Sequence, residues 1–185
     1  MLSLFNCEVV ISNEVDDVRS STHLILPGVS SFGSAMDRIR TLIPLDIVSE
    51  EVFQKRKPFL GICVGMQVLA TKGYEFGERD GLGWIEGEVK KISVSGLSLP
   101  HVGWNEVLLR KPSNILQGIS SSSDFYFVHS YSFMAKYSEH VITETEYGSF
   151  FPSVVQKENI YGVQFHPEKS QQVGMTLISN FLKLE

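Results

Sequence analysis

The sequence predicts an α/β fold in which a mixed sheet with a parallel core is flanked by helices. Its first half alternates short apolar strands with longer amphipathic stretches, an order that gives parallel strands joined by crossover helices. Its second half is rich in further strands, and the end of the chain carries apolar residues at helical spacing. The chain has 185 residues, of which 43% are hydrophobic, so we expect one domain spanning residues 1–185.

In the first half, the apolar segments 7–12 and 22–27 are typical of short buried strands. Residues 32–56 have helical periodicity interrupted at Pro44, which predicts one or two helices. The apolar segment 58–62 predicts a third strand.

The strand-rich half begins after a helix that we predict over residues 65–76. Strands are predicted over 83–94, 104–109, 124–133, 140–145, 150–156 and 160–165. The apolar spacing within residues 170–185 predicts a terminal helix that covers the sheet.

Composition excludes several classes of protein. A formal net charge of −5 and the lack of a basic run argue against nucleic-acid binding, and no apolar run reaches the roughly 20 residues of a membrane span. The first residues do not resemble a signal peptide. The two cysteines, Cys7 and Cys63, form neither a C-x-x-C pair nor a histidine-rich cluster, so we expect no disulfide scaffold, no metal and no cofactor, and a cytoplasmic location.

The most informative short motif is Gly61-Ile62-Cys63-Val64-Gly65, at the predicted change from strand to helix. It matches a nucleophile elbow with cysteine as nucleophile, because the flanking glycines permit the close packing of a sharp turn. The following helix would favour a thiolate, and the Val64 N–H could donate to an oxyanion. The alternative is a buried structural cysteine between incidental glycines.

A thiolate nucleophile needs an imidazole that is oriented by a third group. His166 ends a predicted strand, and Glu168 follows two residues later. The alternative is a loop histidine beside a solvated glutamate. Of the other histidines, we expect His23 to be structural, His140 to be solvated in a turn, and His129 to lie in a strand near the site.

Six segments together resemble the class I (triad) glutamine amidotransferases, and the likeness runs from about residue 7 to the end. They are GICVGMQ (61–67), YGVQFHPEKS (161–170), LILPGVSSFGSAM (24–36), GLGWIEGEV (81–89), PHVGWNEV (100–107) and YFVHSY (126–131). The resemblance implies a flavodoxin-like sheet of the class I glutamine amidotransferase type. It also implies that Cys63 attacks the side-chain amide of glutamine, that His166 moves the proton and that Glu168 orients His166.

The resemblance further implies the residues around the nucleophile. Gly28 and Val29 would complete the oxyanion hole with Val64, and Gln67, Ser130 and Tyr131 would bind glutamine.

The resemblance also implies a heterodimer with a HisF-like (β/α)₈ cyclase, which receives the ammonia and forms imidazole glycerol phosphate in histidine biosynthesis. The resemblance places four residues at the interface with that partner: Tyr126, Lys169, Trp104 and Asn105. The alternatives are that Tyr126 is a core aromatic and that Lys169 is a solvated charge. Ammonia in neutral water is mostly ammonium, which is not nucleophilic, so a sealed route is useful. The chain itself has no phosphate-binding loop for an acceptor.

The chain departs from the family in two places. The family's first strand, with its Gly-Asn loop, has no counterpart before residue 7, so we expect unpaired backbone groups, exposed apolar surface and reduced stability or partner-dependent folding. Ser30 stands where the family has glycine, and a serine restricts a peptide flip that needs positive φ. We therefore expect weak glutaminase activity without the partner.

Three other interpretations remain at this point. A paralogue could supply ammonia to sugar-modifying enzymes of surface polysaccharide synthesis. A catalytically silent binding subunit would keep the fold without the chemistry. A cysteine peptidase would share the thiolate.

Overall fold

The computed structural model describes residues 1–185 and contains a seven-stranded sheet with the order β1-β2-β11-β10-β9-β6-β7. Its parallel core consists of β1 (Leu24–Gly28), β2 (Phe59–Cys63) and β11 (Ile160–Val163). The antiparallel strands are β10 (Ser149–Lys157), β9 (Val141–Tyr147), β6 (His101–Leu109) and β7 (Ser123–His129). The predicted mixed sheet with a parallel core is confirmed.

A second sheet has four strands in the order β4-β3-β5-β8. They are β4 (Arg79–Asp80), β3 (Lys72–Gly73), β5 (Gly87–Lys91) and β8 (Tyr131–Ala135). The predicted strand over 124–133 is therefore two strands, because the chain leaves the main sheet at Ser130 and enters the small one. This change of sheet brings the end of β7 and the start of β8 together beside the parallel core.

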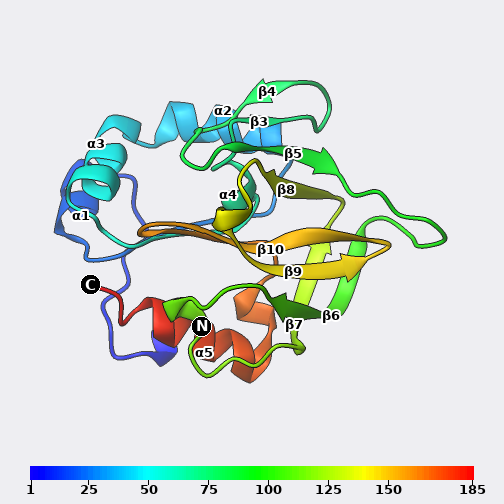
Figure 1. The fold of residues 1–185 in the computed structure, drawn as a ribbon. Helices are drawn as coiled ribbons and strands as arrows, with labels where there is room; N and C mark the ends of the chain where they lie inside the picture. The colour runs from blue at the N-terminus through cyan, green and yellow to red at the C-terminus, as the bar shows by residue number, and fades with distance from the viewer.

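Helices cover both faces of the main sheet (Figure 1). On one face lie α2 (Phe32–Leu42) and α3 (Leu45–Ser49), which continues into a π-helical turn over Glu50–Gln54. Pro44 caps α3, so the predicted interruption is confirmed. The terminal helix α5 (Gln171–Phe181) lies on the other face, as predicted. The short elements are α1 (Val15–Ser20) and the 3₁₀ turns Leu2–Leu4, Asn114–Leu116, Ser138–His140 and Pro167–Lys169.

Two hydrophobic cores, one on each face of the main sheet, hold these layers together. Consecutive strand residues point to opposite faces, so Phe59 joins the core under α2 and α3, while Leu60 joins the core under α5. Val155 and Val154 divide in the same way. Each fully buried side chain of this kind contributes about 1.5–3 kcal/mol to stability.

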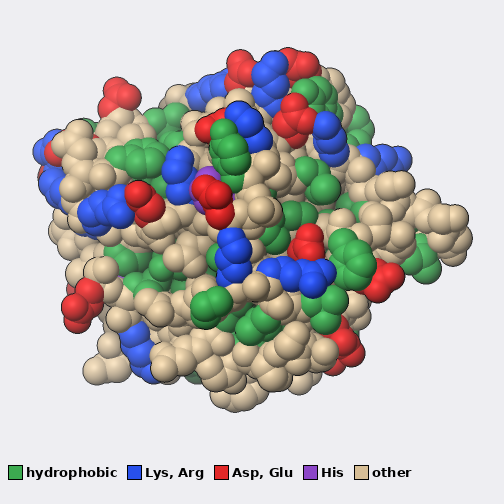
Figure 2. Space-filling model, in the orientation of Figure 1, with side chains coloured by type: hydrophobic (Ala, Val, Ile, Leu, Met, Phe, Trp, Pro, Cys, Tyr) green, Lys and Arg blue, Asp and Glu red, His purple; other side chains and the backbone are tan.

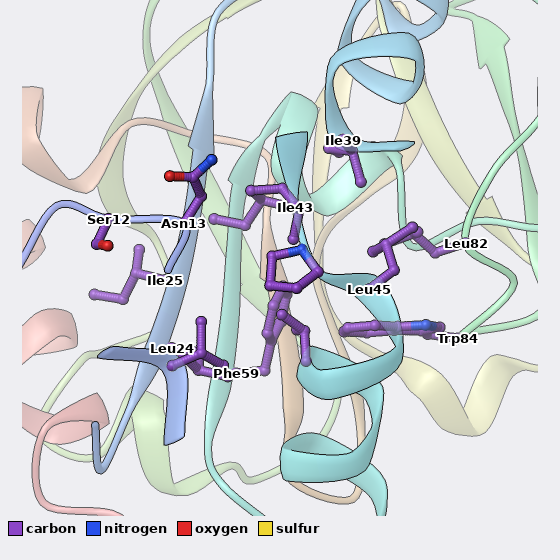
Figure 3. Close-up of a pocket in the computed structure, with 14 residues that line it drawn as sticks. Ser12, Asn13, Leu24, Ile25, Ile39, Ile43, Leu45, Phe59, Leu82 and Trp84 are labelled. Atoms are coloured by element: carbon purple, nitrogen blue, oxygen red, sulfur yellow. The ribbon is translucent and has the colours of Figure 1, made fainter. Parts of the chain in front are cut away.

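The predicted strand over 7–12 is wrong, because these residues are irregular and exposed. A strand needs a partner, and the backbone of this segment has none; the side chain of Ile11 is 99% exposed. β1 therefore forms one edge of the main sheet and pairs only with β2. Beside β1 lies a cavity of about 90 Å³ with mostly apolar walls, in which Ser12 and Asn13 face Leu24 and Ile25 (Figure 3).

The predicted helix over 65–76 is also wrong in length, because α4 comprises only Val64–Gln67. The Thr71 N–H bonds to the Gly87 carbonyl at 2.9 Å, and the next two residues form β3 alongside β5. Pairing with a distant strand thus overrides the local helical pattern.

The surface carries charges of both signs, intermingled on the face that Figure 2 shows. No helix is long and apolar enough to cross a bilayer. No three histidine, cysteine or acidic side chains lie close enough together to hold a metal ion.

Candidate active site

Cys63 ends β2 in a strained backbone conformation with φ of +55°. The two glycines of the motif make the turn possible. A Cβ on Gly61 would lie 2.3 Å from the Gly65 oxygen, and a Cβ on Gly65 would lie 1.9 Å from the Leu26 oxygen. Any larger residue at either position would push α4 away from the strands. The strained turn expected of a nucleophile elbow is therefore present at Cys63.

His166 lies beside Cys63 because their strands are neighbours. Ile62 pairs with Val163 in the parallel ladder between β2 and β11, so the residues after the two strands leave the same edge of the sheet. The His166 ring is buried and lies close enough to Cys63 for the two side chains to interact. Its Nδ1 lies 2.7 Å from Oε1 of the half-exposed Glu168. The structure thus brings all three predicted residues together.

The electrostatics of this group favour an ion pair. Interaction with Cys63 and then the hydrogen bond with Glu168 outweigh burial and raise the pKa of His166 to about 9, so the ring is an imidazolium at neutral pH. Burial acts to raise the pKa of Glu168, but hydrogen bonds from His166 and from its own backbone hold that pKa below its usual value. The ring and the carboxylate therefore carry opposite charges at neutral pH.

The residues expected to form an oxyanion hole lie next to the elbow. Gly28 ends β1 directly opposite Cys63 in the ladder, and a Cβ on Gly28 would lie 2.3 Å from Cγ1 of Val64. Val29 follows with its side chain 85% exposed. Neither Val29 nor Ser30 has a positive φ, so the serine is unstrained in this conformation of the loop.

The three residues expected to bind substrate are close to the elbow as well. Gln67 is buried on α4, and its Nε2 donates to the Tyr131 carbonyl at 2.9 Å. Ser130 joins β7 to β8, and its carbonyl accepts from the Ile92 N–H at 2.9 Å. The break between the two sheets thus carries these backbone groups to the site.

Sequence reasoning assigned no role to Gln164, which is buried directly after β11. Its Nε2 lies 3.8 Å from Sγ of Cys63, and its Oε1 accepts from Nε2 of Gln67 at 3.0 Å. The position two residues before His166 was the only available signal, and it does not show where the side chain points.

Sequence reasoning also missed a buried chain of hydrogen bonds through His101. The amide of Asn105 lies 3.3 Å from His101 Nε2, His101 Nδ1 lies 3.1 Å from His129 Nε2, and His129 Nδ1 lies 2.9 Å from the Tyr131 carbonyl. Amide nitrogens only donate and carbonyls only accept, so every bond in the chain runs from Asn105 towards Tyr131. Burial lowers the pKa of His101 to about 4 and that of His129 to about 3, so both rings are neutral.

Three of the four residues expected at a partner interface form a surface group beside His166, in which Trp104 and Lys169 are exposed and Tyr126 is partly buried. The Trp104 and Tyr126 rings make an edge-to-face contact with centroids 5.8 Å apart, and Lys169 Nζ lies 5.7 Å from the centroid of Tyr126. Asn105 does not share this surface. Its side chain points to the other side of β6, where it bonds to His101 and to the Glu146 carbonyl.

The two remaining histidines lie outside the site. His23 is structural, as expected, because its Nε2 lies 3.1 Å from the Leu184 carbonyl. The expectation of a solvated His140 is wrong. Its ring is partly buried, and its Nδ1 is shielded from solvent without a hydrogen-bond partner.

A strained cysteine elbow, an adjacent histidine–glutamate pair and a mixed sheet with a parallel core together define a glutamine amidotransferase of class I. The family model "Glutamine amidotransferase class-I" matches residues 4–184, and the chain belongs to this family. A solved structure described as a glutamine amidotransferase shares the fold, with a TM-score of 0.72 and 17% identity over 97% of this chain and 89% of its own.

Curated relatives narrow the resemblance to one subunit. The chain is 43% identical to imidazole glycerol phosphate synthase subunit HisH of Pelagibacter ubique, over 95% of this chain and 86% of the relative. It is 42% identical to the HisH subunit of Aquifex aeolicus, over 94% of this chain and 83% of the relative.

Proposed function

We propose that this chain is the glutaminase subunit of an imidazole glycerol phosphate synthase. It hydrolyses L-glutamine to glutamate and ammonia, and the ammonia passes to a HisF-type (β/α)₈ cyclase in histidine biosynthesis. The observation that carries the proposal is the contact of Cys63, on its strained turn, with the His166–Glu168 pair. The HisH relatives, similar over nearly the whole chain, support the choice of pathway.

In the first half of the reaction, the sulfur of Cys63 attacks the side-chain carbonyl carbon of glutamine. The carbonyl oxygen becomes an oxyanion, to which the Val64 N–H and the backbone at Gly28 and Val29, next to the elbow, would donate. His166, protonated at neutral pH, gives its proton to the leaving nitrogen. The C–N bond breaks, ammonia leaves, and a γ-glutamyl thioester remains on Cys63.

In the second half, water attacks the thioester carbon. His166, now neutral, takes a proton from that water, the C–S bond breaks, and glutamate leaves with Cys63 again a thiolate. Glu168 holds the ring in place through its 2.7 Å contact with Nδ1 and stabilises the imidazolium that forms in each cycle.

Gln67, Ser130 and Tyr131 would hold the rest of the substrate. Both N–H groups of the Gln67 carboxamide are used within the protein, but its Oε1 makes no hydrogen bond and can accept one from the substrate ammonium. The Ser130–Tyr131 backbone, fixed where β7 passes into β8, lies on the same side of the elbow.

The surface group of Trp104, Tyr126 and Lys169 would receive the cyclase. Two adjacent aromatic rings are typical of the anchors of a protein interface, and Lys169 places a positive charge beside them. Lys169 is three residues from His166, so a partner docked here would cover the place where ammonia leaves. Such a position keeps ammonia from becoming ammonium in bulk water.

The other interpretations have less support. The HisH relatives favour histidine biosynthesis over polysaccharide synthesis. The intact contact between Cys63 and His166 argues against a silent binding subunit, and membership of the amidotransferase family argues against a peptidase.

The test is glutamate release by the purified chain, alone and with a HisF-type cyclase and its phosphoribosyl acceptor. We expect little turnover alone, strong stimulation by the loaded cyclase, and none with Cys63→Ala in either case. Turnover by Cys63→Ala, or stimulation only by a sugar-modifying enzyme, would contradict the proposal.

A further inference from the structure

The carboxamide of Gln164 is held between the proposed nucleophile and Gln67. Its side chain is completely buried, with Nε2 3.8 Å from Cys63 Sγ and Oε1 3.0 Å from Gln67 Nε2. Its own backbone N–H bonds to the Ser153 carbonyl of β10 at 2.9 Å, which fixes the start of the side chain. Gln164 thus reaches the sulfur from a rigid part of the sheet.

The orientation of this carboxamide is determined by its neighbours. The Tyr131 carbonyl can only accept, so the nitrogen of the Gln67 side chain must face it at 2.9 Å. The second N–H of that nitrogen then points at Gln164, which must answer with its oxygen. The nitrogen of Gln164 is therefore the end that faces Cys63, and an N–H of Gln164 donates to the sulfur.

Apart from the His166 ring, the surroundings of Cys63 offer few other donors. The side chain of Cys63 is buried, so water solvates the sulfur poorly. The helix after it has only four residues and supplies little dipole. The Val128 carbonyl, 4.0 Å from the sulfur, can accept only from a neutral thiol and so opposes ionisation. The N–H of Gln164, a donor to the same sulfur, offsets this carbonyl.

We propose that Gln164 is a positioning residue for the nucleophile: its side-chain N–H, aimed by Gln67 and the Tyr131 carbonyl, holds the sulfur of Cys63 in its ionised form and turned towards His166. This assignment rests on the proposed function in so far as Cys63 is the nucleophile. The contact itself is independent of which enzyme receives the ammonia.

The experiment measures the alkylation rate of Cys63 by iodoacetamide between pH 4 and pH 10. A Cys7→Ser background leaves Cys63 as the only thiol, because the chain has two cysteines. Gln164→Leu removes the donor, and Gln164→Glu places an acceptor in the same space. Gln156→Leu is the matched control, because the carboxamide of Gln156, on β10, bonds to Ser113 and to the Glu158 carbonyl instead.

We expect Gln164→Leu to raise the pH of half-maximal alkylation by about one unit, which is about a tenfold slower rate on the acid side. Gln164→Glu should raise it further, because a carboxylate repels the thiolate. Gln156→Leu should leave it unchanged. An unchanged profile in a folded Gln164→Leu protein would overturn the assignment.

A second measurement covers the case in which the Gln164 variants do not fold. In the otherwise unmodified chain labelled with ¹⁵N-glutamine, the NMR signal of one side-chain amide should change with pH over the same range as the alkylation rate. In Cys63→Ala, this pH dependence of the amide signal should disappear. No such amide would overturn the proposal. If the profile moves as expected while no glutamine is hydrolysed, the proposed function fails and the Gln164 contact stands. If glutamine is hydrolysed but the alkylation profile of Gln164→Leu does not move, the proposed function stands and the role of Gln164 fails.

Discussion

Gly65 packs against Leu26 so closely that a Cβ at position 65 would lie 1.9 Å from the Leu26 carbonyl oxygen. This contact between the start of α4 and the middle of β1 fixes the height of the elbow above the sheet. It also fixes the relation between the Val64 N–H and the end of β1. The geometry around Cys63 therefore requires that position 65 has no side chain.

Gly65→Ala should disturb both stability and activity. The new methyl group must move backbone, which costs about 1–3 kcal/mol or more, and Cys63 moves with it. We expect a lower melting temperature and a loss of most glutaminase activity. Gly33→Ala is the control, since a Cβ there meets only Arg79 at an ordinary 3.7 Å. Equal melting curves for the two variants would contradict the tight contact.

Glu168→Gln should change the pH dependence of the reaction. The pKa of His166 is raised to about 9 by Cys63 first and by Glu168 second, so losing the carboxylate charge lowers this pKa. The imidazolium that protonates the leaving nitrogen is then lost at lower pH. We expect the alkaline fall in kcat to move down by about half a unit or more.

Glu158→Gln is the control for this prediction, because Glu158 pairs with Arg56 on the surface, where the exposed pair is solvated. It should leave the profile in place. An alkaline limb at the same pH in Glu168→Gln and the parent would show that the carboxylate does not act on the ring.

His101→Phe should flatten the dependence of stability on pH in acid. The pKa of His101 is lowered to about 4 by burial, so between about pH 6.5 and pH 4 the unfolded chain binds a proton that the folded chain does not. This histidine thus removes up to about 1.4 kcal/mol of stability for each pH unit of acidification. The phenyl ring of the variant keeps the stacking on Phe127 and Tyr147.

Urea unfolding at several pH values would measure this effect. At pH 7.5 the variant should be about 1–3 kcal/mol less stable than the parent, because His129 loses a donor, and the gap should narrow towards pH 4.5. Tyr147→Phe, which removes a 2.7 Å hydrogen bond to the Ser98 carbonyl, should give a gap that does not vary with pH. A constant gap for His101→Phe would mean that His101 does not titrate as described.

Trp104→Ala should weaken association with a HisF-type cyclase by about tenfold to a hundredfold, since exposed aromatic anchors carry much of the energy of an interface. Calorimetric titration of the two subunits would measure it. Phe150→Ala is the matched control, because the Phe150 side chain is 46% exposed and that of Trp104 is 47% exposed. Similar affinities for both variants would move the interface elsewhere.

Sequence patterns predict correctly those elements whose signal lies within one short stretch of the chain. Pro44 separates two helices, and the apolar stripe of α5 covers a sheet face, because each signal is contained in a short stretch. The segment 7–12 has the composition of a strand but no strand to pair with. The helix predicted over 65–76 ends early because the Thr71 N–H bonds to the Gly87 carbonyl of another strand.

The site divides in the same way. Cys63 and His166 each lie in a recognisable motif, so the sequence alone predicted that they lie in one site. The contacts of Gln164 and His101 follow only from the way the strands pair in the folded sheet. The register of β2 with β11 brings the first to Cys63, and that of β6 with β7 places His101 opposite His129. The register between strands that are far apart in the sequence depends on which faces are buried in the assembled sheet, and no single short stretch shows this.

The open outer edge of β1 bears on how the protein behaves in concentrated solution. Pairing with β2 uses the backbone groups of β1 on one side only, and the neighbouring segment with Ile11 adds apolar surface. Two molecules that meet along such an edge can extend one another's sheet. Light scattering should therefore rise with concentration, and bulky charged substitutions along residues 9–11 are the simplest route to a better-behaved preparation.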